Sequence, residues 1–477
     1  RALTDARLES KRAFGDDAVI VERYITRPRH IEVQVAGDRH GNVIDLGTRE
    51  CSVQRRYQKL IEEAPAPNIT AATEHRLRSS AVALAGAIGY DSLGTVEFVV
   101  DDETGDPFFL EMNTRLQVEH PVTEAVTGLD LVELQLRIAM GEVAPFGSTP
   151  PLVGHAFEVR INAEDPSRDF MAQTGTTVAV VTPAWARWDS GIVAGSVITP
   201  FYDSMVGKLI VAGPDRDTAR RRMVAALDEV LIAGVRTNSG FQRWLLTQPP
   251  IVAGRVTTRF IDEAGPLPTS YGVDHRALAA VAWCVAATTG TAAEDAWRRI
   301  GRRRFTPHAG SIVISLEDLD GDVADVSVHR RDGSWWVDES VVMSAVTIDG
   351  ARLHWTADDV SHTGQLHLDR HARIVALAVN GATETYRVLD GSERTAQAGA
   401  GGGMADALRA PFPAVVTEVH VGAGQAVRAG DVLVVIEAMK ILHSLLATGD
   451  GVVAAMHVAP GDQVASREVL ITFEEEQ

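Results

Sequence analysis

The chain has 477 residues, 45% of them hydrophobic, and a formal net charge of −19. This length supports about three domains of roughly 150 residues each. The excess of acidic residues disfavours nucleic acid or an anionic membrane as a partner, because both would repel the protein. Cys51 and Cys284 lie too far apart in sequence for a metal-binding motif, and so few cysteines indicate a reducing compartment.

Two further features bear on location. The most apolar stretch, residues 277–287, is too short to span a bilayer, which takes about 20 residues. Lysine occurs only at Lys11, Lys59, Lys208 and Lys440, whereas arginine is abundant. Such a bias is typical of a GC-rich coding genome. We therefore expect a cytoplasmic bacterial protein, or a mitochondrial matrix protein if the source is eukaryotic.

The first half of the chain mixes helical and strand patterns. In chain order, we expect helices over residues 1–14, 70–88 and 129–140, and strands over residues 19–24, 30–35, 43–47, 93–100, 108–112 and 155–161. The strands over 93–100 and 108–112 should form a hairpin. This mixture predicts an α+β enzyme-like region that extends to about residue 261.

Polar side chains recur at every second position from residue 111 to residue 119. If this segment is one strand, a single face carries Glu111, Asn113, Arg115, Gln117 and Glu119. Burying five polar groups without partners would be costly, so a functional arrangement is expected. The oxygen ligands of Glu97, Glu111 and Asn113 suit Mg²⁺. Arg115 and Lys59 suit an anion, and Glu119 is a carboxylate that could act as a base.

Several long runs in this region closely resemble the biotin carboxylase branch of the ATP-grasp enzymes. They are Pro28-Arg29-His30-Ile31-Glu32-Val33-Gln34-Val35, Gln54-Arg55-Arg56, Glu62-Glu63-Ala64-Pro65-Ala66-Pro67, residues 111–123, Arg160-Ile161-Asn162-Ala163-Glu164-Asp165 and Tyr202-Asp203-Ser204-Met205. The resemblance covers roughly residues 1–262.

The resemblance implies a role for each matching residue. Metal binding, to Mg²⁺ or Mn²⁺, falls to Glu97, Glu111 and Asn113. ATP contacts fall to Glu22, Arg23, Ile25, His30, Gln54 and Tyr57. The bicarbonate cradle consists of Lys59, Arg115, Gln117 and Val118. Glu119 is expected to deprotonate bicarbonate, and Arg160 to stabilise the ureido oxygen of biotin.

The same resemblance raises an expectation about the start of the chain. Members of this branch begin with a nucleotide-fold subdomain and a Gly-rich lid over the phosphates. Neither precedes Arg1. The resemblance therefore implies an N-terminally incomplete carboxylase, which should be inactive with ATP on its own.

The middle of the chain has a different pattern. Residues 274–300 predict one or two Ala-rich helices, in which Cys284 is expected to be a core residue. Eight short alternating segments predict a closed antiparallel barrel: residues 312–316, 323–328, 334–337, 341–348, 352–355, 363–368, 374–379 and 383–388. In position and length this region is similar to the helix-plus-barrel domain of acyl-CoA carboxylase α subunits of the methylcrotonyl- and propionyl-CoA type. The similarity implies that it docks a carboxyltransferase β subunit.

The C-terminal region is an internal repeat with Lys440 at its join. His420 and His457 stand 37 residues apart, and the residues around them match at the same offset. Two equal halves of short strands predict a flattened β-sandwich, with a hairpin that exposes Lys440. Ala438-Met439-Lys440 resembles the signature of the biotin carrier domain, which implies biotinylation of Lys440 by a biotin protein ligase. Ile441 stands where the signature usually has a second methionine.

The predicted fold is therefore multidomain. It comprises an α+β ATP-grasp part over residues 1–262, a helix plus antiparallel barrel over 263–395, a Gly/Ala linker over 396–404, and an all-β biotinyl/lipoyl-type sandwich over 405–477. We expect the α subunit of a biotin-dependent acyl-CoA carboxylase that uses MgATP, bicarbonate and biotin. Two alternatives stay open: an ATP-grasp ligase with a lipoate-bearing carrier, and a non-catalytic carrier or scaffold.

Overall fold

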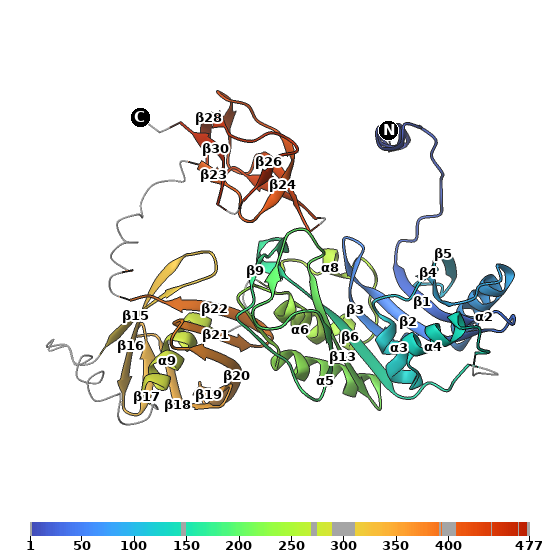
Figure 1. Cartoon of the computed structure of the whole chain (residues 1–477), viewed down its shortest axis with the longest axis horizontal. Coiled ribbons are helices and arrows are strands. Elements are labelled where there is room, and N and C mark those ends of the chain that lie inside the picture. The colour runs from blue at the N-terminus through green and yellow to red at the C-terminus, as the bar shows by residue number, and fades with distance from the viewer. Residues whose placement is uncertain are drawn as a thin grey trace.

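A computed structural model describes residues 2–144, 149–268, 274–288, 311–390, 393, 407–439, 441–465 and 467–474. The chain forms a large sheet flanked by helices, a closed barrel with one helix, and a small all-β sandwich (Figure 1). This succession confirms the predicted order of an α+β part, a helix-plus-barrel part and an all-β part. Within the described ranges, no helix combines the length and apolar content that crossing a bilayer requires.

The large sheet has eight antiparallel strands in the order β11-β13-β6-β3-β2-β1-β4-β5. In chain order these strands are β1 (Pro28–Gly37), β2 (Val43–Arg55), β3 (Gln58–Ala64), β4 (Leu93–Asp101), β5 (Pro107–Asn113), β6 (His155–Asn162), β11 (Arg187–Ser190) and β13 (Met205–Gly213). The hairpin of β4 and β5 confirms the sequence prediction. One sheet thus collects segments that are far apart in sequence.

The helices of this part are α1 (Ala2–Phe14), α2 (Ala71–Ala87), α3 (His120–Thr127), α4 (Leu131–Ala139), α5 (Arg216–Asp228), α6 (Ser239–Thr247), α7 (Pro249–Val252) and α8 (Phe260–Glu263). Helix α1 is exposed and stands apart from the sheet (Figure 1). Helix α2 begins as predicted, because the Thr70 side chain accepts a hydrogen bond from Thr73 N. Short pieces complete this part: β7 (Glu164–Asp165), a 3₁₀ turn (Pro166–Arg168), β8 (Met171–Ala172), β9 (Gly175–Thr176), β10 (Ala179–Val181), β12 (Val197–Ile198) and β14 (Leu231–Ala233).

The predicted strand over residues 19–24 is wrong. This segment is extended but belongs to no sheet, and it links α1 to β1 (Figure 1). Ile20 and Val21 are 89% and 86% exposed, so no neighbouring strand covers them. A β-prone composition gives a strand only where a partner supplies hydrogen bonds and a buried face.

The middle part is a closed barrel, and all eight predicted strands are present. They are β15 (Ile312–Glu317), β16 (Val323–Arg331), β17 (Ser334–Val337), β18 (Val341–Asp349), β19 (Arg352–Ala357), β20 (Val360–Asp369), β21 (Ile374–Val379) and β22 (Ala382–Val388). Helix α9 (His275–Thr288) packs its apolar side chains, including Cys284, into one cluster with the barrel interior. Cys284 is thus a core residue, as predicted. The rest of the predicted helical stretch, residues 289–300, lies outside the described residues.

The C-terminal part consists of two four-stranded sheets, which confirms the flattened sandwich. Its strands are β23 (Ala407–Arg409), β24 (Ala414–Val419), β25 (Ala426–Val427), β26 (Val432–Ala438), β27 (Ile441–Leu446), β28 (Gly451–Met456), β29 (Gln463–Val464) and β30 (Val469–Phe473).

The repeat in sequence is also a repeat in space. Gly424 N donates to Val453 O and Gly461 N donates to Val416 O, each at 2.7 Å. The two donors are 37 residues apart, and so are the two acceptors. The first bond therefore runs from one half to the other, and the second bond repeats it with the two halves exchanged. The sandwich therefore has internal pseudo-twofold symmetry. Lys440, between β26 and β27, and the predicted linker over 396–404 lie outside the described residues.

Candidate active site

A row of charged side chains crosses the large sheet from one strand to the next. Glu111 on β5 pairs with Glu97 on β4, which pairs with Glu32 on β1, which pairs with Arg49 on β2. Directly paired residues on antiparallel strands hold their side chains close together. The register of the sheet thus concentrates three carboxylates beside one guanidinium.

Arg49 is the buried cation of this row, with 0% of its side chain exposed. It donates to Glu32 at 2.5 Å, to the Gln34 and Thr123 side chains at 2.7 and 2.9 Å, and to Gln117 at 3.2 Å. A buried guanidinium with so many acceptors is stabilised, whereas one without them would be costly. Arg49 therefore fixes the carboxylates and amides around it in place.

Glu119 lies where the neighbouring groups meet. It is 2% exposed, and its two oxygens accept from two different cations: Lys59 Nζ at 2.6 Å and Arg160 at 3.0 Å. Burial disfavours the charged guanidinium, but the carboxylates of Glu62 and Glu119 outweigh it and raise the pKa of Arg160. The structure thus brings together three predicted site residues from β3, β6 and the start of α3.

Lys59 binds three carboxylates at once. Besides Glu119, its Nζ lies 2.7 Å from Glu32 and 3.0 Å from Glu97. Burial opposes the ammonium form, yet the charge of Glu32, together with the other carboxylates, raises the pKa of Lys59. For Glu32 the balance also favours the ion: burial opposes ionisation, but Arg49 and Lys59 lower its pKa to about 2. These side chains therefore form a charged network.

The predicted metal ligands converge around one amide. Asn113 Nδ2 lies 3.0 Å from Glu97 and 2.9 Å from Glu111. Burial opposes ionisation of Glu97, but the hydrogen bond from His30 and the charge of Lys59 lower its pKa to about 2. The Asn113 amide turns its nitrogen toward these carboxylates here, and its oxygen together with the two carboxylates would supply the hard oxygen ligands that Mg²⁺ prefers. The residues present thus fit the predicted ion.

A second group could also hold an ion, since the ligand atoms of His30, Glu32 and Glu97 lie within 4.8 Å of one another. We favour the predicted set, because its three members offer the hard oxygen ligands that suit Mg²⁺, whereas His30 offers a nitrogen. His30 Nε2 lies 2.6 Å from Glu97 and orients that carboxylate.

The prediction of one continuous strand from residue 111 to residue 119 is wrong. Strand β5 ends at Asn113, and Glu119 is the residue immediately before α3, with Pro121 in the first turn of that helix. Proline at the start of a helix is favourable, whereas it could not donate within a strand ladder. The intervening loop carries exposed Arg115 and buried Gln117, whose amide donates to Glu97 at 2.6 Å. The predicted residues still converge, but through a loop.

A pair of glutamates lies on the other side of Arg160. Glu62 on β3 pairs directly with Glu158 on β6, and both are 0% exposed. Arg160 donates to Glu62 at 2.6 Å, whereas among the described residues no hydrogen bond reaches either oxygen of Glu158, and Lys208 Nζ lies 4.0 Å from one of them. Burial, together with the charge of Glu62, raises the pKa of Glu158 well above its ordinary value. This pair therefore favours a protonated Glu158.

Lys208 on β13 is a site residue that the sequence alone did not reveal. It pairs with Arg160 across the strands, and its Nζ donates to the main-chain carbonyl of Val118. Val118 belongs to the loop that was predicted to bind bicarbonate. Two signals pointed to Lys208: lysine is rare in this chain, and the residue follows the Tyr202–Met205 run.

Other unpredicted members of the network are Glu32, Arg49, Glu62 and Glu158. Strand β1 offered a signal for the first, because Glu32 and Gln34 alternate with Ile31, Val33 and Val35. Glu62 lay inside a quoted motif. No periodicity marks Arg49, whose partners come from distant strands.

The predicted ATP contacts are more dispersed. Gln54 is nearly buried near the end of β2, and Tyr57, at the β2–β3 turn, is 95% exposed. Glu22 and Arg23 are exposed in the extended segment before β1, where the Arg23 guanidinium lies 5.1 Å from the Phe108 ring centroid. Ile25 in the same segment is half-buried. The structure thus brings His30 and Gln54 to the sheet but leaves Glu22, Arg23 and Ile25 in the approach segment.

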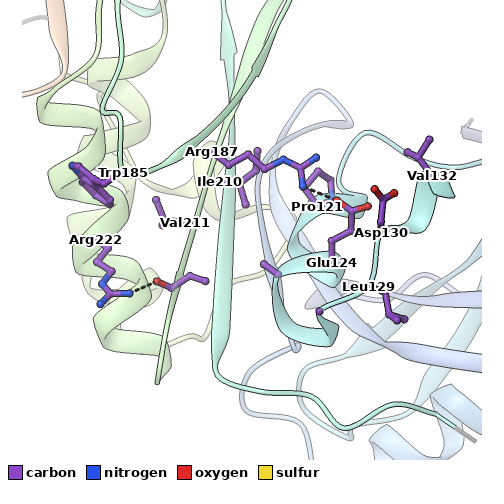
Figure 2. Close-up of a pocket in the computed structure, with 13 residues that line it drawn as sticks. Pro121, Glu124, Leu129, Asp130, Val132, Trp185, Arg187, Ile210, Val211 and Arg222 are labelled. Atoms are coloured by element: carbon purple, nitrogen blue, oxygen red, sulfur yellow. Dashed lines mark hydrogen bonds and ion pairs between the residues drawn. The ribbon is translucent and has the colours of Figure 1, made fainter. Parts of the chain in front are cut away.

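A cavity of about 1080 Å³ lies elsewhere (Figure 2). Its lining comes from α3, β11, β13 and α5, and includes the ion pair of Arg187 and Glu124 at 2.6 Å. It contains none of the predicted site residues. The chemistry of the buried charges, rather than the size of this hollow, therefore decides the candidate active site.

Comparison with protein families finds three matches along the chain. Residues 1–145 match the family described as the carbamoyl-phosphate synthase L chain ATP-binding domain. Residues 158–263 match the biotin carboxylase C-terminal domain, and residues 406–473 match a family described as biotin-requiring enzyme. The fold and these matches define a biotin carboxylase with a carrier domain on the same chain.

Relatives that match nearly the whole chain indicate the same class of protein. The mitochondrial methylcrotonoyl-CoA carboxylase subunit alpha of Mus musculus is 36% identical, over 100% of this chain and 68% of its own length. The propionyl-CoA carboxylase alpha chain of Ruegeria pomeroyi is 35% identical, over 98% of this chain and 73% of its own. The chain thus spans about two thirds to three quarters of these relatives.

Solved structures match the first part. The biotin carboxylase domain of a thermophilic 2-oxoglutarate carboxylase bound to bicarbonate is 42% identical, with a TM-score of 0.55, over 57% of this chain and 62% of its own. The biotin carboxylase–βγ-ATP complex from Campylobacter jejuni is 43% identical, with a TM-score of 0.52, over 55% of this chain and 58% of its own. The chain belongs to the family of biotin-dependent acyl-CoA carboxylase α subunits, ATP-dependent ligases that use biotin, ATP and Mg²⁺.

Proposed function

We propose that the buried network around Glu119 is the site at which this chain carboxylates biotin. One observation carries the proposal: Glu119 is 2% exposed and lies between Lys59 at 2.6 Å and Arg160 at 3.0 Å. A buried carboxylate with two cationic partners can receive a proton within a preorganised electrostatic environment. Glu119 is the base that deprotonates bicarbonate.

Bicarbonate binds beside this base. Lys59 and Arg115 supply positive charge, while Gln117 and the main chain of Val118 supply hydrogen bonds. The solved relative described as bound to bicarbonate supports this substrate. Arg160 binds the ureido oxygen of biotin. Biotin, when attached, supplies the nitrogen that accepts the carboxyl group.

MgATP occupies the side of the sheet toward β5. Glu97, Glu111 and Asn113 hold Mg²⁺, and His30, Gln54, Tyr57, Glu22, Arg23 and Ile25 contact the nucleotide. Support comes from the closeness of the three side chains, because Asn113 Nδ2 hydrogen-bonds to both Glu97 and Glu111. Glu111→Gln should shift the Mg²⁺ dependence of turnover to higher concentration, by more than the tenfold or so that loss of an outer-shell partner costs. An unchanged Mg²⁺ dependence would contradict this ligand set.

Lys440 carries the biotin, attached by a biotin protein ligase. Support comes from the pseudo-twofold symmetry of the sandwich and from Met439, which is buried at the end of β26. Peptide mass spectrometry of the purified protein should find biotin, and neither lipoate nor an unmodified lysine, on Lys440. Lys440→Arg should abolish streptavidin binding, and persistent binding in that variant would contradict the assignment.

The barrel region, residues 263–395, docks a separate carboxyltransferase β subunit. The relatives are named as α subunits or chains, and the acyl-CoA is of the methylcrotonyl or propionyl type. Deleting residues 263–395 should leave Lys440 biotinylated but abolish co-purification with the carboxyltransferase. Retained co-purification would place the docking surface elsewhere.

The remaining assignments follow the same family. The domain limits are 1–262, 263–395 and 405–477, with a linker over 396–404. The location is the bacterial cytoplasm or the mitochondrial matrix, where thiols stay reduced. Both cysteines are buried, as suits such a compartment.

A further inference from the structure

The carrier sandwich touches the carboxylase part through its hairpin turn. Met439, the residue before Lys440, donates its main-chain N–H to the carbonyl of Pro200 at 2.9 Å and is 2% exposed. Pro200 lies in the loop between β12 and β13. The apolar side chains of the carrier form one continuous cluster with those of the carboxylase part, in which Met439 joins Phe170 and Ile198.

Charged groups of the carboxylase border the same hairpin. His443 on β27 is buried, and its ring lies 5.1 Å from that of Phe412, edge to face. Burial lowers the pKa of His443, and the charges of Asp169, Arg56 and Arg55 also act on it. Arg55 itself donates to Asp169 at 2.7 Å and lies 3.9 Å from the Phe170 ring centroid. The β2–β3 turn and residues 169–170 thus line one side of the hairpin.

A second contact joins the carrier to the barrel. Arg467, on the loop before β30, donates to the main-chain carbonyl of Asp320 at 3.1 Å. Asp320 lies in the turn between β15 and β16, at the end of the barrel that faces the other two parts (Figure 1). A Cβ on Gly321, whose φ is +86°, would lie 2.6 Å from the Arg467 guanidinium. Glycine at this position therefore permits the close approach.

The same turn is bonded to the carboxylase. The Asp320 carboxylate accepts from Arg168 at 2.7 Å and from Arg236 at 2.8 Å. Burial opposes its ionisation, but the hydrogen bond and charge of Arg236 lower the pKa of Asp320. One residue of the barrel thus meets both the carboxylase, through its side chain, and the carrier, through its main chain.

The charges of this junction are complementary. The turn bears three carboxylates, Asp318, Asp320 and Asp322, of which Asp318 also pairs with Arg276 at 3.3 Å, and the carrier presents a further cation, Arg467, to the main chain of the turn. Opposite charges across an interface set its orientation and speed its formation. The contact is exposed, so it orients the carrier without holding it permanently.

The contacted loop leads directly to the proposed chemistry. Met205, five residues after Pro200, pairs with Asn162 at the end of β6, and β6 carries Arg160. Ala163 N also donates to Ser204 O at 2.7 Å. A carrier seated on Pro200 therefore rests at the end of the strand that carries Arg160.

We propose that the β15–β16 turn of the barrel and the Pro200 loop of the carboxylase together form the seat that holds the carrier domain during biotin carboxylation. The barrel then serves both half-reactions, because it positions the carrier at the carboxylase as well as docking a second subunit. This inference rests on the proposed function, since it needs a carrier that delivers biotin to the Glu119 site.

Charge reversal at Arg467 tests the seat in the biotinylated full-length protein. Arg467→Glu places a carboxylate against the three aspartates of the turn. Transfer of radiolabelled carboxyl from bicarbonate to the protein's own biotin should slow by about tenfold. Carboxylation of free biotin should not change, nor should the biotin content of Lys440 by mass spectrometry. Arg428→Glu, an exposed arginine elsewhere on the carrier, is the matched control and should behave as wild type.

A second variant acts from the barrel side. Asp320→Asn keeps the carbonyl that Arg467 binds but weakens the ion pairs to Arg168 and Arg236, so transfer should slow less, by about threefold. The proposed seat is wrong if Arg467→Glu transfers the carboxyl group at the wild-type rate, or if Arg428→Glu slows the transfer equally. It is also wrong if Arg467→Glu slows the carboxylation of free biotin as much as that of the protein's own biotin. If the wild type labels free biotin but not its own, the proposed carrier function fails, and the seat fails with it.

Discussion

The carboxylase sheet and the barrel both have eight antiparallel strands, yet they bury different side chains. The sheet buries Glu32, Arg49, Glu62 and Glu158, each with 0% exposed. The buried residues of the barrel over residues 311–390 are apolar or uncharged, and they surround an Ala-rich helix. The two structures thus share an architecture and differ in what their interiors contain.

This difference separates chemistry from packing. Burying a charge is costly unless partners compensate, and even paired charges add little to stability relative to apolar groups. A sheet that retains so many buried charges therefore indicates a use for them other than stability. The barrel, with an interior filled by apolar side chains, is suited to present a rigid outer surface.

Removing the proposed base should give the largest effect. In a full-length version of the protein, Glu119→Gln keeps the size and shape of the side chain but removes the proton acceptor and one of the two oxygens that accept from Lys59 and Arg160, so carboxylation of free biotin should fall by about 10²- to 10⁴-fold. The KM for MgATP should change little. Glu142→Gln is the control, because Glu142 is an exposed glutamate paired with Arg137 at 2.8 Å. Steady-state kinetics measure the turnover of both variants. Wild-type turnover in Glu119→Gln would show that Glu119 is not the base of the reaction.

A cavity in the barrel should affect stability alone. Leu353 is 0% exposed, so Leu353→Ala should lower the free energy of unfolding of the barrel by about 2–5 kcal/mol. Free-biotin kinetics, measured well below the unfolding temperature, should stay at the wild-type level. A matching loss of turnover would show that the barrel interior takes part in the carboxylase chemistry.

Lys208 should affect the binding of bicarbonate and not that of MgATP. Lys208→Met keeps the apolar stem but removes the donor to Val118 O, so the loop that binds bicarbonate loses its anchor. The energy of a hydrogen bond from a charged group corresponds to about a tenfold change in affinity. The KM for bicarbonate should therefore rise by about this factor, and the KM for MgATP should not change. Lys11→Met, an exposed lysine on α1, should leave both constants unchanged. An equal rise in both KM values would indicate general damage instead.

Glu158 should affect stability through pH rather than turnover. Its folded pKa is raised, so above the ordinary glutamate pKa of about 4.3 the unfolded chain loses a proton that the folded chain keeps. The wild type therefore loses up to about 1.4 kcal/mol of stability per pH unit until the folded pKa is reached. Glu158→Gln has no such term. The free energy of unfolding of Glu158→Gln, measured in denaturant, should match wild type at low pH and exceed it increasingly as the pH rises above the ordinary glutamate pKa; a constant difference would contradict a protonated Glu158.

The sequence predicted the barrel and the carrier well, because their signals are local. The barrel strands are short runs rich in apolar and β-branched residues at regular intervals, and turns such as Asp332-Gly333 separate them. The carrier's offset of 37 residues reappears in its hydrogen bonds. Residues 19–24 misled because strand formation there would need a partner strand.

The charged network was only partly predictable. Glu97, Glu111, Lys59, Glu119 and Arg160 were reached through motifs, and the structure places them together. The contacts of Lys208 and Arg49 depend on the register of strands far apart in sequence. Shifts in the pairing of β2 with β3 also move side chains relative to simple alternation. Such registers are tertiary properties that no local pattern encodes.

One measurement tests the central claim, that the buried charges of the sheet serve a biotin on Lys440. Purified full-length protein is incubated with radiolabelled bicarbonate and MgATP, without acyl-CoA, and the label bound to the protein is counted. We expect label in the wild type, a loss of about 10²-fold or more in its initial rate in Glu119→Gln, and none in Lys440→Arg. Label that persists in Lys440→Arg, or a wild-type rate in Glu119→Gln, would contradict the account.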